Sequence, residues 1–366
     1  MTAPSPLLDL DDTASLEAAD SVGALRSAAL GGAQVRATAA AVDEDALAAL
    51  RGLRPRSVLL VTSAGRAARA ASIVVAFLGG RAGLPVLHVD ATPPWVGPLD
   101  VVIVAGDDAG DPRLLAAVDR AVRRGAEVVL AAPVEGPLRA AAAGRASILA
   151  PRVPVHDTNT LMRHVAAGFA VLQAVDATRT GPLLPDLADL ADVLDAEAVR
   201  DNPRNEVFHN PAKSLAVRLH LRDVVLAGDT PQTTALAAHG AEILLRSAGM
   251  SAVAADLVDV IAAAAKLGGA GAAASAGYDP FFHDEEIDGP RPRDPMRVFV
   301  LTTEPDRRVT ERKVAVLPDA DLIAVDPEGG EQQPRGADDF EPLAILAVRL
   351  EMAAAYLQLM TAGESV

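Results

Sequence analysis

The sequence predicts an α/β protein built from two doubly wound parallel-sheet domains, each a flavodoxin- or Rossmann-like sandwich. Short apolar runs rich in β-branched residues alternate with helix-like segments between residues 57 and 176, and a similar alternation follows residue 205. Half of the residues are hydrophobic but only 3% are aromatic, so the core has to consist mostly of Ala, Val and Leu. Such a composition is typical of helices packed on buried parallel strands.

Five apolar runs in the first half have the length and composition of buried strands. The expected strands are 58–61, 86–89, 101–104, 128–130 and 148–149, and the expected helices are 66–78, 112–124, 137–143 and 160–176. Asp111 followed by Pro112 has the pattern of an N-cap with Pro at the first helical position. Gly125 is expected to end that helix.

The second half repeats this alternation and sets the domain boundaries. The expected helices are 212–221, 233–247 and 340–360, and the expected strands are 224–227 and 298–301. The Gly- and Ala-rich tract 268–277 is expected to be a mobile loop. We expect a first domain at 1–180, a linker rich in Pro, Asp and Leu at 181–205, and a second domain at 206–366.

Composition excludes several classes of function. The net charge of −16 argues against nucleic acid as a partner, because phosphate backbones require clustered cations. The absence of Cys excludes a disulfide scaffold, a thiolate metal site and a cysteine nucleophile. The first residues do not form a signal peptide, and the apolar stretches are interrupted before membrane-spanning length, so a cytoplasmic protein without a membrane partner is expected.

Common cofactor and hydrolase motifs are missing. The sequence contains no Walker loop and no Gly-x-Gly-x-x-Gly, which disfavours a nucleotide cofactor, and it contains neither a Gly-x-Ser-x-Gly elbow nor His-Glu-x-x-His. The acidic run 284–288 could hold a hard cation, but a solvated loop explains such a run more simply, so no metal is expected.

Two short segments carry a resemblance to a known family. The run Asn210-Pro211-Ala212-Lys213-Ser214-Leu215-Ala216, followed by Val224-Val225-Leu226-Ala227-Gly228, resembles the second domain of the bifunctional phosphoglucose/phosphomannose isomerases. The segment His283-Asp284-Glu285-Glu286-Ile287 resembles that family's "HNE" segment. The resemblance implies two sugar isomerase (SIS) domains, an aldose–ketose isomerisation of glucose 6-phosphate or mannose 6-phosphate, and a homodimer with its active site at the interface.

The resemblance also supplies candidate catalytic residues. His283 matches the ring-opening His, and Arg152 stands where the family has an Arg near the enediolate. The catalytic carboxylate has no direct match, since Arg246 lies in the corresponding region. Glu242, Glu285 and Glu206 are the alternatives for that base.

Candidate substrate-binding residues lie at the first strand-to-helix turn and in the Asn-Pro-Ala-Lys run. Thr62, Ser63, Gly65 and Arg66 could bind an anion through hydroxyls, backbone N–H groups and a helix N-terminus, or could form a plain turn. Lys213 is either a substrate contact or a structural contact at the start of a helix.

The chain also departs from the family pattern. The loop that binds phosphate in the family is here Ala105-Gly106-Asp107-Asp108-Ala109-Gly110-Asp111, whose carboxylates would repel a phosphate, and the C-terminal Lys is missing. Three hypotheses follow: a sugar-phosphate-binding member with catalysis weak or lost, an active isomerase with an unusual base, and a non-catalytic dimeric scaffold.

Overall fold

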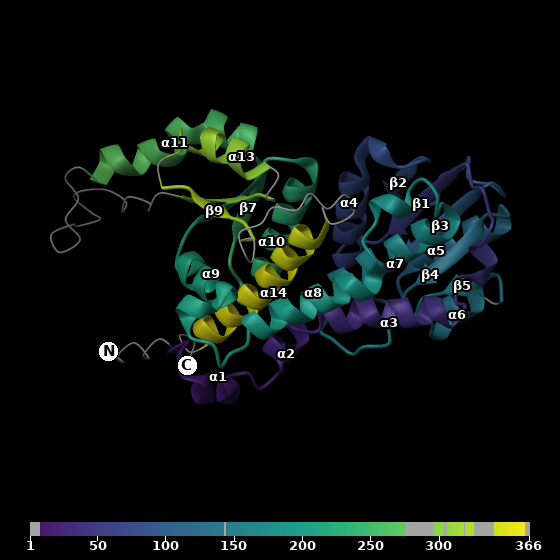
Figure 1. The fold of residues 1–366 in the computed structure, drawn as a ribbon, viewed down its shortest axis with the longest axis horizontal. Helices are drawn as coiled ribbons and strands as arrows, with labels where there is room; N and C mark the ends of the chain where they lie inside the picture. Colours follow the sequence, from purple (N-terminus) through teal and green to yellow (C-terminus); the bar gives the residue numbers. More distant parts are fainter. Residues whose placement is uncertain are drawn as a thin grey trace.

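Two parallel β-sheets form the frame of the molecule (Figure 1). The computed structural model describes residues 8–142, 144–275, 296–303, 306–317, 319–325 and 340–362. The first sheet has the order β2-β1-β3-β4-β5 and the second has the order β7-β6-β8-β9, with every pairing parallel. The predicted fold class is confirmed. The strands are β1 (Ser57–Thr62), β2 (Val86–Val89), β3 (Asp100–Ala105), β4 (Glu127–Ala131), β5 (Ala146–Ile148), β6 (Val224–Gly228), β7 (Ala252–Asp256), β8 (Arg297–Leu301) and β9 (Asp321–Ile323).

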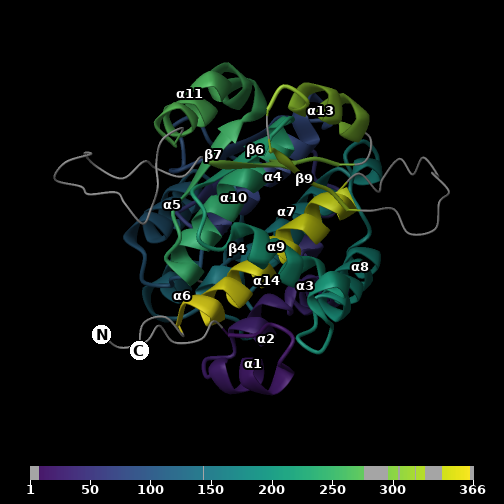
Figure 2. The ribbon, with the colours of Figure 1, turned by 90° about the vertical axis from the view of Figure 1, so that its left-hand side faces the viewer.

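The central strands are apolar throughout because both faces of each sheet are covered by helices. In β1, Val58 and Leu60 pack on the helices between the sheets, whereas Leu59 and Val61 pack on the outer helices. The outer face of the first sheet carries α5 (Pro112–Arg123) and α6 (Gly136–Ala142). The outer face of the second sheet carries α11 (Leu257–Ser275) and α13 (Arg307–Val314) (Figure 2).

Helices between the two sheets form a single hydrophobic core. This layer contains α3 (Gly31–Asp43), α4 (Arg66–Leu78), α7 (Leu161–Val175), α8 (Leu187–Arg200), α9 (Pro211–Leu219), α10 (Pro231–Ala248) and α14 (Glu341–Ala362). Phe77 of α4, Phe169 of α7 and Phe340 beside α14 pack together with centroids 4.7–6.0 Å apart, and Phe340 meets the other two rings edge to face. One continuous core therefore joins the inner faces of both sheets.

Helix α14 lies at the centre of this layer (Figures 1 and 2). Residues Glu341–Thr361 are long and apolar enough to cross a membrane, but 94% of the apolar window is buried inside the protein. Its charged residues Arg349 and Glu351 are buried as well. The pattern is that of a core helix in a soluble protein.

Smaller elements complete the chain. Helices α1 (Thr13–Ala19) and α2 (Ala24–Ala28) precede α3. Short 3-10 turns lie at Ala48–Leu50, Gly79–Arg81, Asp157–Asn159, Gly181–Leu183 and Val207–His209.

Several sequence predictions can be compared with these elements. Asp111 is the N-cap of α5, since its carboxylate accepts a hydrogen bond from Arg113 N at 2.8 Å. The prediction of a loop at 268–277 was wrong where the structure describes the backbone, because α11 continues to Ser275. The expected linker 181–205 contains α8, which packs on α3 and α14. The domain boundaries stay a prediction.

Candidate functional site

The first sheet reverses its winding between β1 and β3, and we call the space outside the carboxyl ends of these two strands the crevice. Helix α4 leaves β1 on the inner face of the sheet, whereas α5 leaves β3 on the outer face. Ligands of open α/β sheets bind where the direction of winding reverses, outside the carboxyl ends of the strands. The loops 63–65 and 106–111 therefore flank the position at which a ligand is expected.

The turn between β1 and α4 leaves the N-terminus of α4 open. Gly65 is the N-cap with φ of 103°, and no side chain caps the helix there. The second sheet differs, because Thr230 and Thr233 form a capping box at the start of α10. The first N–H groups of α4 are thus available to an anion, whereas the corresponding end of α10 is already satisfied by its own side chains.

Thr62 and Ser63 are engaged with neighbouring side chains. The hydroxyl of Thr62 lies 2.8 Å from Nε2 of His88, and Nδ1 of His88 lies 3.2 Å from the Ser72 hydroxyl. Burial lowers the pKa of His88 and favours the neutral ring. The carboxyl of Asp111 lies close enough to Ser63 for this hydroxyl to contribute to the lowering of its pKa, after the contribution of Arg113, so a carboxylate stands beside this predicted phosphate contact.

Arg66 and Glu242 meet between α4 and α10. The Arg66 side chain is wholly buried and its Nη2 contacts Oε1 of Glu242, while Arg69 Nε donates to Oε2 of Glu242 at 2.8 Å. Burial and the charge of Arg246 lower the pKa of Arg66 to about 10, so it stays protonated at neutral pH. Arg66 Nε and Nη1 have no partner within the described part of the chain. Both oxygens of Glu242 are therefore occupied by guanidinium groups.

A second layer of polar groups lies beneath this pair. Nε2 of His239 lies 3.2 Å from Oε1 of Glu351, and Asn159 donates to the other oxygen of Glu351 at 3.1 Å. Asn159 in turn accepts a hydrogen bond from Ser27 at 2.8 Å. Burial lowers the pKa of His239 despite the nearby carboxylate. These contacts connect α2, the 3-10 turn Asp157–Asn159, α10 and α14 below the crevice.

Asp107, in the acidic loop, is held by the start of α7. Its carboxylate accepts hydrogen bonds from Thr160 at 3.1 Å, from Nη2 of Arg163 and from Nε2 of His164 at 3.1 Å. Burial alone would raise the pKa of Asp107, but the hydrogen bond from His164 and the charge of Arg163 outweigh burial and hold it below its ordinary value.

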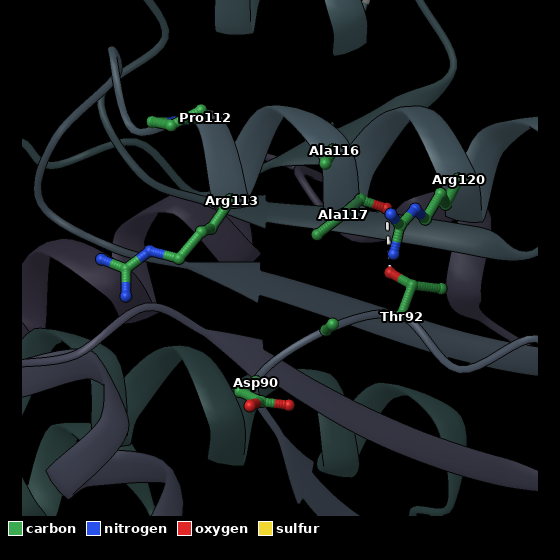
Figure 3. Close-up of a pocket in the computed structure, with 8 residues that line it drawn as sticks. Asp90, Thr92, Pro112, Arg113, Ala116, Ala117 and Arg120 are labelled. Carbon is green, nitrogen blue, oxygen red and sulfur yellow. Dashed lines mark hydrogen bonds between the residues drawn. The ribbon is translucent and has the colours of Figure 1, made fainter.

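A hollow of about 250 Å³ lies between α5 and the loop that follows β2 (Figure 3). Asp90, the first residue after β2, lines it opposite Arg113 and Arg120 of α5. Thr92 closes one side by donating to the Ala117 carbonyl at 3.0 Å. Arg113 also binds Asp111, the last residue of the loop 106–111, so the hollow adjoins the crevice.

The remaining candidates lie elsewhere. Arg152 forms a two-point ion pair with Glu44 at 2.8 and 2.7 Å on the surface. Lys213 is fully buried, and its Nζ donates to the carbonyls of Leu10, Pro203 and Asn205 at 2.5–2.7 Å. Figure 1 shows its helix, α9, far from β1.

Three further candidates complete the comparison. Glu206 is exposed and precedes the turn Val207–His209. His283 and Glu285 lie outside the described residues. Among the described residues no group of three His, Asp or Glu side chains could hold a metal ion.

Sequence reasoning missed Arg163, His164, His239 and Glu351. Glu351 gave a usable signal, since a charge within an apolar helix requires a buried partner. His164 and His239 gave none, because a His on an apolar helix face is most simply a core residue.

Two solved structures with this fold belong to enzymes that are named after sugar phosphates. The tagatose-6-phosphate ketose/aldose isomerase of Escherichia coli matches with a TM-score of 0.57 and 14% identity, over 93% of this chain and 91% of that one. The fold is that of SIS-domain phosphosugar isomerases. The C-terminal domain of glucosamine-fructose-6-phosphate aminotransferase from Francisella tularensis matches with a TM-score of 0.54 and 10% identity, over 93% of this chain and 96% of that one. No protein-family model and no curated protein matches the sequence.

Proposed function

We propose that this SIS-fold protein binds a sugar phosphate or a related carbohydrate derivative, with isomerase catalysis weak or lost. The observation that carries the proposal is the uncapped N-terminus of α4, which opens at the winding reversal of a sheet whose fold is used by phosphosugar isomerases. A phosphate there would accept hydrogen bonds from the first backbone N–H groups of α4 and from Ser63.

The adjoining hollow suits the carbohydrate part of such a ligand. Asp90 has no partner within the described part of the chain, and its carboxylate can accept hydrogen bonds from two sugar hydroxyls. Arg120 is likewise without a partner within those residues, and it can donate to hydroxyl or phosphate oxygens.

Two carboxylates at the crevice, Glu242 and Asp107, are unsuited to moving a proton. Glu242 is bound by Arg66 and Arg69, and Asp107 is bound by Arg163 and His164. Proton abstraction next to a sugar carbonyl requires a carboxylate that can reach the substrate and whose charged form is not stabilised by guanidinium groups. Weak or lost catalysis follows. By the resemblance we also propose a cytoplasmic homodimer.

Binding is tested by calorimetry with glucose 6-phosphate and mannose 6-phosphate, with glucose as the comparison. We expect a response to the phosphates and none to glucose. The variant Ala64→Asp places a carboxylate at the α4 N-terminus and should weaken binding at least tenfold, whereas its neutral isostere Ala64→Asn should bind like the wild type. Equal affinity in Ala64→Asp and Ala64→Asn would refute the α4 site.

Catalysis is tested by a coupled isomerase assay with both substrates. We expect no turnover above background in the wild type. Turnover that disappears in His283→Ala would instead show an active isomerase. Turnover that disappears in Glu242→Gln as well would assign the base to Glu242.

A further inference from the structure

Three donors from one helix end converge on the side chain of Asp107. Thr160 is the N-cap of α7 but makes no side-chain cap within its own helix, and its hydroxyl donates instead to Oδ2 of Asp107. Arg163 and His164, in the first turn, both donate to Oδ1. A hydroxyl, a guanidinium, an imidazole and a helix N-terminus are together the donor set of a phosphate site.

The donors are buried, and Arg163 carries the positive charge that the Asp107 carboxylate balances, because burial lowers the pKa of His164 and favours its neutral ring. The side chain of His164 is 1% exposed and that of Arg163 is 11% exposed. Arg163 Nε and His164 Nδ1 have no partner within the described residues. A buried guanidinium without an anion is unstable, so these residues require a negative group at this point.

A further observation comes from a different helix. The Arg66 side chain, from α4, is wholly buried, and two of its nitrogens have no partner among the residues that the structure describes. Asp107 is one of the carboxylates whose charge acts on Arg66. The charge of Asp107 therefore favours the protonated forms of both a buried guanidinium on α4 and Arg163 on α7.

We propose that the start of α7 is an anion site for phosphate or a phosphomonoester, occupied in this chain by its own Asp107. The carboxylate is tethered in the loop between β3 and α5, and Gly106 packs closely on Leu114 at the base of that loop. A tethered group acts at an effective concentration of millimolar or more, so it excludes free phosphate from this site. The site uses donors from α7 and does not depend on the ligand proposed at α4.

The test removes the internal carboxylate and supplies inorganic phosphate. Melting temperatures of the wild type and Asp107→Ala are compared in sodium phosphate and in sodium chloride of equal ionic strength at pH 7.5. We expect Asp107→Ala to gain about 3 °C or more from phosphate beyond the gain of the wild type, at a concentration near one hundred times Kd. The comparison is repeated with Ala64→Asp in both proteins, which weakens phosphate binding at α4, so a gain in melting temperature that persists there belongs to the site at α7.

Matched variants make the test decisive. Asp108→Ala removes the neighbouring carboxylate, which accepts a hydrogen bond from the backbone N–H of Gly110, and its melting temperature should gain no more from phosphate than that of the wild type. Adding Arg163→Gln to Asp107→Ala should abolish the gain. If Asp107→Ala does not fold, Asp107→Asn takes its place, because the amide fills the same space without the charge. The proposal is overturned if phosphate raises the melting temperature of a folded Asp107 variant no more than that of the wild type. It is also overturned if Asp108→Ala gains as much in melting temperature as the Asp107 variant.

Discussion

Replacing Asp201 by Asn should stabilise the protein increasingly as the pH rises. Asp201 follows α8, is fully buried, and accepts one hydrogen bond from Ala212 N at 3.0 Å, while its Oδ2 has no partner within the described residues. Burial, and then the charge of Glu197, raises the pKa of Asp201 to about 7, against the opposing charges of Arg349 and Arg200. The folded protein therefore holds a proton here that the unfolded chain releases at much lower pH.

The size of the effect follows from linkage. A carboxyl whose pKa rises from 3.8 to about 7 on folding makes the folded state lose stability as the pH rises between those values. At 1.36 kcal/mol per pKa unit the loss reaches about 4 kcal/mol above pH 7. Asn has no charge to bury, although its amide leaves an N–H group unpaired at a pH-independent cost of about 2 kcal/mol. The stability of Asp201→Asn relative to the wild type should therefore increase by about 4 kcal/mol between pH 4 and pH 8.

Urea unfolding at pH 4, 5, 6, 7 and 8 measures this difference. Asp189→Asn is the matched control, because Asp189 is an exposed carboxylate on the same helix and its variant should stay within about 0.5 kcal/mol of the wild type. If the difference in free energy of unfolding between Asp201→Asn and the wild type is constant within about 1 kcal/mol across this pH range, the reasoning about Asp201 is refuted.

Three further changes have expected outcomes. Lys213→Met should cost about 3 kcal/mol or more in urea unfolding, since three carbonyls lose their buried donor, and a cost below about 1 kcal/mol would contradict a structural role. Arg152→Ala should leave the melting temperature and ligand affinity nearly unchanged because its ion pair with Glu44 is exposed, so a clear loss of affinity would return Arg152 to the site. Gly228→Ala should prevent folding or lower the melting temperature by more than 5 °C, because its Cβ would lie about 2.1 Å from Thr234 N, and a circular dichroism melt like that of the wild type would show that α10 can move aside.

The sequence predicted the elements whose pattern is local. β1 and β3 are buried on both faces and therefore read as continuous apolar runs. β7, with Ala at three of its five positions, and β9, with three residues, lack that signal and were missed. The Gly-Gly in α11 suggested a loop, but the helix continues through it.

The candidate site was predictable only in part. The turn at Thr62–Gly65 lies at the carboxyl end of β1, where its pattern placed it. The partners of Asp107 are more than fifty residues away in sequence, and those of Lys213 belong to two separate segments. Such pairings depend on how helices pack across the layer, which no local pattern encodes.

The shared core between the sheets determines how cooperatively the chain unfolds. Because α4 of the first half packs on α10 of the second, and Phe169 of α7 packs on Phe340 beside α14, neither half has a complete surface of its own. Separating them would expose the apolar sides of several helices at once, a change of the same order as unfolding itself. We therefore expect one heat-absorption peak in calorimetry, and fragments ending near residue 180 that aggregate. A ligand at α4 would therefore bind without a hinge motion between the halves, since their own packing holds them together.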